Sequence, residues 1–277
     1  IKAMLPVIEL TFKTLVVGDI FEKVSRSFPN VMTESEALDL VQFGAFPDGR
    51  LDLIFGQGVD RSMIERAIKQ RFAAEPGMLH RISLQDDAVM PRAVKRLAHK
   101  DKPANVCVGT PIQLDDSKFR LDLHFSASNE FFGDHMTGMH IQGMALTEAA
   151  RQSFLAVSEM FYLNGREGRF YFVIKSFASR YTNFVFPLAA HIDYEVRRAS
   201  LKDSSASFDV HMKLWQAETV CAEFDVEFTA FAEAKISERE TSMMGERLSV
   251  LLSPGEALGH VPPLADSGSA GQMAALA

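Results

Sequence analysis

The sequence predicts an α+β fold, in which a small α/β module precedes a domain built from one long helix and antiparallel strands. Strand-like and helical stretches alternate over residues 1–77, and one long helical stretch follows at about residues 143–162. Beyond that helix the chain consists of long strands in which apolar and polar residues alternate. Because no second long helix lies nearby in sequence, this helix must bury its apolar side on a sheet that wraps around it. That arrangement is a single hot-dog domain.

The first 77 residues predict two strands and two helices. The run VIELTFKTLVVG is strand-like, ESEALDLVQF is helical, RLDLIFG is strand-like, and DRSMIERAIKQRF is a helix that closes before Pro76 and Gly77. Gly56 and Gly58 lie between the second strand and the second helix, as in a phosphate-binding turn. The full glycine fingerprint is absent and no Lys-Ser/Thr follows, so nucleotide binding is disfavoured.

Residues 78–238 are predicted to form the hot-dog. The segment PRAVKRLAHK, residues 91–100, is a candidate for a short basic helix. In KFRLDLHF, residues 118–125, every second side chain is apolar, which predicts a half-buried strand in a hairpin through Asp115 and Asp116. Four strands follow the long helix: RFYFVIKSF, NFVFPLAAHIDYEV, ASFDVHMKLW and TVCAEFDVEFTAF. Residues 239–277, rich in Ser, Gly, Pro and Ala, are predicted to be a flexible tail.

Composition excludes several classes of protein. The chain has 277 residues, 47% of them hydrophobic, which suffices for a core. Its net charge of -7 disfavours general nucleic-acid binding. Cys107 and Cys221 lack metal-ligand spacing, so we expect buried thiols, no metal and a reducing, cytoplasmic environment. No apolar run reaches the roughly 18 residues of a membrane span, and no signal peptide is recognisable, although the first residue, Ile1, is compatible with a fragment.

The long helix and the segment before it supply the candidate site. Periodicity alone favours an ordinary amphipathic helix in which Glu148 and Arg151 form an exposed pair, which contributes only about 0.2–0.5 kcal/mol. The preceding segment, GDHMTGMHIQG, favours a catalytic site over an ordinary amphipathic helix. Gly143 lies where a helix begins, so its N–H can polarise a thioester carbonyl as in an oxyanion hole. Glu148 is then a candidate base or orienting acid, and His135 and His140 are candidates for proton transfer.

The stretch HIQGMALTEAARQ closely resembles the signature of the AfsA-type hot-dog proteins, the A-factor biosynthesis family. The matching residues, in order and spacing, are His140, Gly143, Met144, Glu148, Ala149, Arg151 and Gln152. The aspartate that usually precedes the histidine is Met139 here, and Asp134 with His135 is a candidate substitute. The likeness extends more weakly from His80 and Arg81 to about Phe231.

The resemblance implies a substrate class, which is an acyl chain carried as a thioester on acyl carrier protein or coenzyme A, with no bound cofactor. It implies transfer of a β-ketoacyl group to a dihydroxyacetone-phosphate-like hydroxyl in the synthesis of butyrolactone signals or secondary metabolites. Glu148, His140, His135 and Gly143 would carry the chemistry. The remaining candidates would bind or position the substrate: Asp134, Gly138, Met144, Arg151 and Gln152. Because a lone hot-dog leaves a sheet edge exposed, we also expect a homodimer.

Two other readings stay open. A hydroxyacyl-thioester dehydratase, of which the FabZ type is a more distant likeness, or a thioesterase of the same fold would use the same Glu and His. A non-catalytic ligand-binding or scaffold hot-dog is the second alternative. A local basic patch is either a docking surface for a carrier protein or for the phosphates of coenzyme A, or a solvated face. It consists of Arg92, Lys95, Arg96, Lys100 and Lys102.

Overall fold

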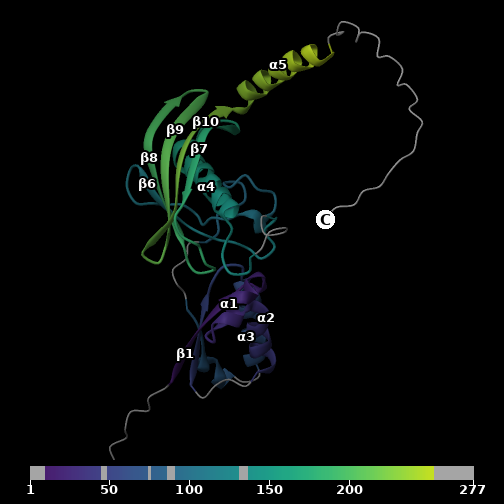
Figure 1. Ribbon diagram of the computed structural model, residues 1–277, viewed down its shortest axis with the longest axis vertical. Coiled ribbons are helices and arrows are strands. Elements are labelled where there is room, and N and C mark those ends of the chain that lie inside the picture. Colours follow the sequence, from purple (N-terminus) through teal and green to yellow (C-terminus); the bar gives the residue numbers. More distant parts are fainter. Residues whose placement is uncertain (1–9, 45–48, 74–75, 86–90, 131–136, 253–277) are drawn as a thin grey trace, which may run out of the picture. The chain divides into compact units, whose positions relative to one another are not determined.

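The computed structural model describes residues 10–44, 49–73, 76–85, 91–130 and 137–252 (Figure 1). Contacts within the chain group residues 1–232 into one compact unit and residues 233–277 into a second. Among the helices of the described residues, none combines the length and apolar character needed to cross a bilayer. The division of the first unit at residue 77 stays a prediction.

The N-terminal part is a four-stranded parallel sheet in the order β2-β1-β3-β4. Its strands are β1 Thr11–Val17, β2 Val31–Thr33, β3 Arg50–Phe55 and β4 Ile82–Leu84. Its helices are α1 Glu22–Ser27, α2 Glu34–Phe43 and α3 Arg61–Phe72. Strand β4 pairs with β3, so the parallel sheet extends past residue 77, the end that the sequence predicts for the module.

The two faces of this sheet bury different partners. Val16 packs in a cluster with residues of α2 and α3, whereas its neighbour Val17 packs with Phe21 and Val24 in the core of the larger domain. Successive side chains of a strand point to opposite faces, which explains the split. Helix α2 begins after Thr33, whose side chain accepts from the backbone of the third helical residue in a capping box. Because Val24 of α1 is in the core of the larger domain, α1 packs with that domain and not with α2 and α3.

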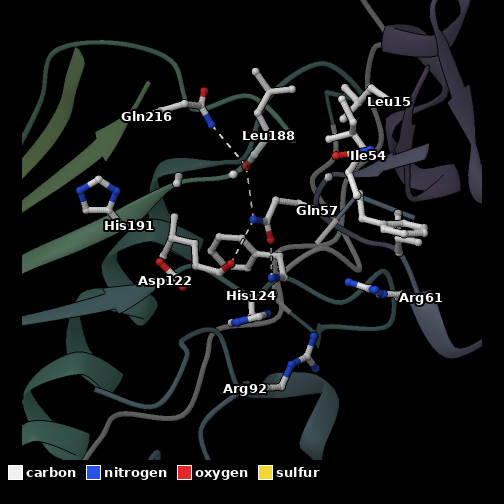
Figure 2. A pocket seen from close by; sticks show the side chains of 18 of the residues that line it. Leu15, Ile54, Gln57, Arg61, Arg92, Asp122, His124, Leu188, His191 and Gln216 are labelled. Carbon is white, nitrogen blue, oxygen red and sulfur yellow. Dashed lines mark hydrogen bonds between the residues drawn. The ribbon is translucent and has the colours of Figure 1, made fainter. Parts of the chain in front are cut away.

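The loop after β3 joins this sheet to the larger domain. The Gln57 side chain donates to the carbonyls of Leu123 (3.0 Å) and Leu188 (3.3 Å) and accepts from the backbone N–H of Phe125 at 2.8 Å (Figure 2). A Cβ on Gly56 would lie 2.1 Å from the Pro187 carbonyl oxygen, so only glycine fits there. The glycines that resemble a phosphate-binding turn thus permit close docking of backbone on backbone.

The larger domain is a six-stranded sheet in the order β5-β6-β8-β9-β10-β7, in which every pairing is antiparallel. Its strands are β5 Ile112–Gln113, β6 Lys118–Asp122, β7 Phe170–Tyr181, β8 His191–Lys202, β9 Ser205–Gln216 and β10 Thr219–Ala232. Strand β9 alternates without a break between buried and partly exposed residues, as the sequence predicts. One edge of the sheet is the short β5, and the other is the long β7.

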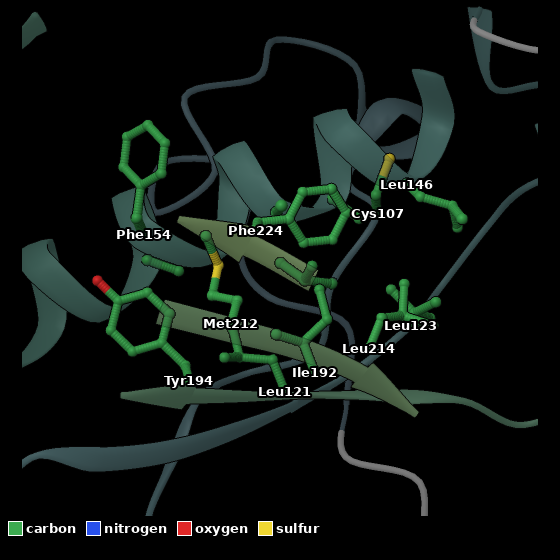
Figure 3. Packing of buried hydrophobic residues seen from close by; sticks show 14 of the residues in the cluster. Cys107, Leu121, Leu123, Leu146, Phe154, Ile192, Tyr194, Met212, Leu214 and Phe224 are labelled. Atoms are coloured by element: carbon green, nitrogen blue, oxygen red, sulfur yellow. The ribbon is translucent and has the colours of Figure 1, made fainter. Parts of the chain in front are cut away.

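The long helix packs on this sheet. Helix α4 spans Gly143–Val157 and continues as a π-helical turn, Ser158–Tyr162, close to the predicted bounds. The Phe154 ring stacks on Phe228 of β10 with centroids 4.4 Å apart. In Figure 3, Leu146 and Phe154 of the helix face Ile192 and Leu214 of the strands across the core. The predicted α+β fold, a single hot-dog preceded by a small α/β module, is confirmed.

Two sequence predictions are wrong. Residues 91–100 form turns instead of a helix, because Ala93 N–H bonds to the Val108 carbonyl and fixes this segment to a neighbouring strand-like segment. Residues 239–252 are not tail but the end of helix α5, Glu233–Leu252. Good helix formers such as Glu, Arg, Met and Leu fill that stretch, and Pro254 follows it. Residues 253–277 lie outside the described residues.

Candidate functional site

The carboxylate of Glu148 lies at the centre of a buried ionic cluster on α4. Its Oε1 is 2.7 Å from Lys100 Nζ and accepts from Arg151 Nη2 at 2.8 Å and from Gln152 Nε2 at 2.9 Å. Its Oε2 accepts from Arg151 Nε at 2.7 Å. Only 7% of Glu148 is exposed, so the interpretation as an exposed surface pair is wrong. We call Glu148, Lys100, Arg151 and Gln152 the carboxylate cluster.

Gln152 ties this cluster to the segment that precedes β5. Its Nε2 donates to the Asn105 carbonyl at 2.8 Å, and its Oε1 accepts from the Cys107 N–H at 2.7 Å. Gln152 is fully buried, so each of these bonds replaces one that water would make in the unfolded chain. The cluster therefore holds the chain around Lys100–Cys107 against the middle of α4.

The surroundings set the proton affinity of two groups. Burial of Glu148 raises its pKa, but hydrogen bonds from Arg151, Lys100 and Gln152 outweigh burial and bring the pKa below its ordinary value. Burial raises the pKa of the Cys107 thiol to about 11. At neutral pH Glu148 is therefore an ion of low basicity and Cys107 a neutral thiol, and neither is poised for attack or proton abstraction.

A second cluster surrounds the start of α4. The Gly143 carbonyl accepts from Thr147 Oγ1 at 3.1 Å and from the Tyr181 hydroxyl at 3.2 Å. The His140 ring packs on the Phe184 ring with centroids 4.7 Å apart. Met144 and Phe184 are each 66% exposed, and Tyr181 is 44% exposed. We call this group the helix entrance: His140, Gly143, Met144, Thr147, Tyr181 and Phe184.

The predicted residues thus fall in two groups. Within the described part of the chain, no hydrogen bond or ion pair joins Glu148 to His140. His140 Nδ1 instead lies 3.3 Å from Thr137 Oγ1. Asp134 and His135 lie outside the described residues. Gly138 has a positive φ of 76°, a left-handed conformation that favours glycine whatever its role.

A search of the solved structures returns small proteins of low identity. One from Shewanella oneidensis, proposed to be a thioesterase, has 14% identity and a TM-score of 0.38 over 50% of this chain and 96% of its own. A hypothetical thioesterase from Streptococcus pneumoniae, solved with coenzyme A, has 12% identity and a TM-score of 0.34 over 50% and 98%. No curated protein matches the sequence.

A family match decides what the chain is. Residues 83–232, more than half of the chain, match the family described as "AfsA: A-factor biosynthesis hotdog domain". The chain belongs to the AfsA family. The predicted membership is confirmed, and the matched span lies within the predicted domain of residues 78–238 and ends with β10.

Sequence reasoning missed the partners of this AfsA signature. Lys100 contacts Glu148 from a distant loop, and Tyr181 reaches Gly143 from the end of β7. No sequence spacing links either pair, because loop and strand are brought to the helix by the tertiary fold. Only the i,i+3 and i,i+4 contacts of Glu148 with Arg151 and Gln152 follow from helical spacing.

Three of the five cations of the basic patch lie next to carboxylates within the AfsA domain. Lys100 belongs to the carboxylate cluster, Lys102 is paired with Glu130, and Arg96 lies 3.9 Å from Glu159. Charges paired in this way present less net positive potential to a partner than their number suggests. Among the described residues, no three His, Cys, Asp or Glu side chains gather as a metal site.

Proposed function

We propose that this AfsA domain acts on acyl thioesters as an acyltransferase. It would move a β-ketoacyl group from acyl carrier protein or coenzyme A to a hydroxyl acceptor in butyrolactone-type signal or secondary metabolite synthesis. Family membership supports acyl thioesters as the substrate class. The observation that carries the proposal is the helix entrance, where a buried helix begins beside exposed apolar side chains.

The entrance suits a thioester for two physical reasons. The first N–H groups of an α-helix have no partner within the helix and carry partial positive charge, so they stabilise the oxyanion that forms at an attacked carbonyl. Met144, Tyr181 and Phe184 offer apolar surface beside this point, against which an alkyl chain can lie. The N–H of Gly143 is the proposed carbonyl polariser.

The proton must pass through a group that can accept it. In acyl transfer the acceptor oxygen forms a bond to the carbonyl carbon, the C–S bond breaks, and the hydroxyl proton leaves with the thiol. Glu148 is a weak base because its pKa is lowered. We assign the proton transfer to His140, at the entrance, and give Glu148 the role of holding Arg151 and Lys100 in place. Asp134, His135, Gly138 and Gln152 remain candidates for binding or positioning.

A product assay tests this function against its alternatives. The full chain is incubated with 3-ketoacyl, 3-hydroxyacyl and saturated acyl thioesters, with and without dihydroxyacetone phosphate as acceptor, and products are identified by mass spectrometry. An ester that forms only with the ketoacyl donor and the acceptor supports acyl transfer. An enoyl product indicates a dehydratase, a free acid indicates a thioesterase, and no product from any donor contradicts the enzymatic proposal.

Two variants separate catalysis from scaffold. His140→Gln should abolish ester formation with little change in the melting temperature, because His140 is partly exposed and, among the described residues, its hydrogen bonds are to Thr137 alone. His211→Gln, on β9, is the matched control and should keep activity. The scaffold alternative gains weight from Glu148, whose carboxylate is already occupied by partners. It predicts that His140→Gln leaves the biological activity intact.

The assembly is also a proposal. Strand β7 forms an edge of the sheet over residues Phe170–Tyr181, and Tyr171, Val173 and Ile174 are exposed along it. A long apolar edge favours pairing with another strand. We propose a homodimer that extends the sheet through this edge and functions in the cytoplasm. Gel filtration with light scattering tests it, and a monomer at micromolar concentration would contradict it.

A further inference from the structure

A cavity of about 670 Å³ lies where the parallel sheet meets the hot-dog (Figure 2), and none of its lining residues belongs to the helix entrance. On the module side it is lined by the ends of β1 and β3 and by the loop that contains Gln57. On the hot-dog side it is lined by residues 122–125 and 188–191. A volume of this size is typical of small-molecule sites, which occupy roughly 300–1,000 Å³.

The topology of the parallel sheet favours a ligand at this place. In the order β2-β1-β3-β4, the strand that follows β1 in the chain lies toward one edge of the sheet, and the strand that follows β3 lies toward the other edge. The crevice between the carboxyl ends of two such strands is the usual ligand position in open parallel sheets. Leu15 near the end of β1, and Ile54 and Phe55 at the end of β3, line the cavity.

Arg92 gives the cavity its chemical character. Its backbone is fixed by a bridge to Gly109, and its side chain donates one hydrogen bond, to the Pro103 carbonyl at 3.1 Å. Among the described residues, no carboxylate forms an ion pair with it. Burial lowers the pKa of Arg92 and outweighs the attraction of Asp60, which does not form an ion pair with the guanidinium. A partly buried guanidinium with no ion pair among the described residues is costly, so an anion in the cavity would be stabilised by it.

Two further basic side chains, Arg61 and His124, line the cavity near Arg92. In Figure 2, Arg61 and His124 lie along the side of the cavity that Arg92 occupies. The Arg61 guanidinium packs over the Phe55 ring at 5.2 Å while its Nε donates to Glu65 at 2.8 Å, which holds the side chain in one orientation. The rest of the wall is largely apolar, from Leu15, Ile54, Leu123, Phe125, Leu188 and Ala190.

We propose that this cavity binds a small amphipathic anion. Its carboxylate or phosphate group would contact Arg92 and Arg61, and its apolar body would lie against Ile54 and Leu188. Asp122, which lies with His191 toward the other end of the cavity in Figure 2, would keep the anionic group on the arginine side. This site is separate from the helix entrance and does not depend on the acyltransferase proposal.

Isothermal titration calorimetry with the full chain tests the proposal. The probes are octyl phosphate and octanoate below their micelle concentrations, with octyltrimethylammonium, octanol and inorganic phosphate as controls. The proposal expects at least one of the two anionic amphiphiles to bind and the neutral and cationic ones to bind more weakly. Which of the two anions binds more tightly identifies the head group. If neither anion binds, or octanol binds as tightly, the proposal is overturned.

Variants show whether the probe occupies this cavity. Arg92→Gln should weaken binding about 10- to 100-fold, the usual effect of losing a hydrogen bond to a charged group. Arg96→Gln, in the same segment but with an exposed side chain, is the matched control and should leave affinity unchanged. Ala189→Trp, at an exposed position on the cavity wall, should block the site without disturbing the core. Unchanged affinity in folded Arg92→Gln and Ala189→Trp proteins would overturn the proposal.

Discussion

Replacing Glu148 by Gln should destabilise the fold even though the side chain keeps its shape. The substitution removes the charge that neutralises Lys100 and Arg151, whose side chains are only 19% and 31% exposed. Removing one partner of a fully buried ion pair costs about 3–5 kcal/mol, and partial exposure of the two cations reduces this to about 2–3 kcal/mol. For a protein of this size the melting temperature should fall by about 4–12 °C.

Thermal unfolding followed by circular dichroism measures this effect. Glu159→Gln is the matched control, because the cation that Glu159 meets, Arg96, is 78% exposed and stays hydrated. Glutamine can keep the hydrogen bond that Glu159 makes with His99 Nε2 at 3.1 Å. The control should lose less than about 1 kcal/mol. If Glu148→Gln melts within about 1 °C of the wild type, or no lower than Glu159→Gln, the ion pairs of the carboxylate cluster do not stabilise the fold.

The difference in stability between the wild type and Glu148→Gln should depend on pH in a defined direction. Because the folded pKa of Glu148 is lowered, its contribution to the free energy of unfolding is complete above the unfolded value, near 4.5, and is lost as the pH falls through the folded pKa. The gap between the wild type and Glu148→Gln should therefore be constant from about pH 6 to pH 8 and narrow below pH 4.5. A gap that widens in acid would refute the assignment.

Three other substitutions or treatments test the surrounding structure. Gln152→Leu should cost about 2–4 kcal/mol in chemical denaturation, because it removes the acceptor of the buried Cys107 N–H and leaves the Asn105 carbonyl with only the weak hydrogen bond from Cys107 Sγ. Iodoacetamide at pH 8 should label Cys107 only after unfolding, since its pKa is about 11 and it is buried, and labelling of the native protein by mass spectrometry would contradict this. Gly56→Ala should destabilise by about 1–3 kcal/mol, whereas Gly245→Ala, in open space on α5, should be neutral or stabilising; equal effects in thermal melts would contradict the docking role of Gly56.

The sequence predicted those parts of the fold whose signal is periodic. The alternation in β9 and the apolar stripe of α4 specify which faces are buried, because a strand repeats every 2 residues and a helix about every 3.6. The helix predicted at residues 91–100 is wrong because the same spacing of charged residues also suits a segment whose backbone hydrogen bonds run to a neighbouring segment instead of within a helix. Only the pairing of Ala93 with Val108 decides between the two.

The site was predictable to the extent that it lies on one helix. Glu148, Arg151 and Gln152 come together because residues three and four apart share a face of α4. The charge that completes the cluster comes from Lys100, on a loop whose path is set by tertiary contacts. The enzymatic hypothesis requires a sheltered Glu148, but a sequence pattern does not identify a partner that the tertiary fold supplies, so the contact with Lys100 and the lowered pKa of Glu148 are not predictable from the sequence.

The spacing of the AfsA signature has a physical account in this structure. A glutamate followed by arginine and glutamine at i+3 and i+4 lets a single carboxylate bind both side chains, while the glutamine reaches the backbone around Cys107. That spacing fulfils a structural requirement before any substrate is present. The chemistry proposed for His140 and Gly143 belongs to the start of the same helix, which begins beside exposed apolar side chains. A substitution in the carboxylate cluster can therefore lower the stability of the fold and leave the helix entrance intact. Stability and turnover should respond to different residues of one motif.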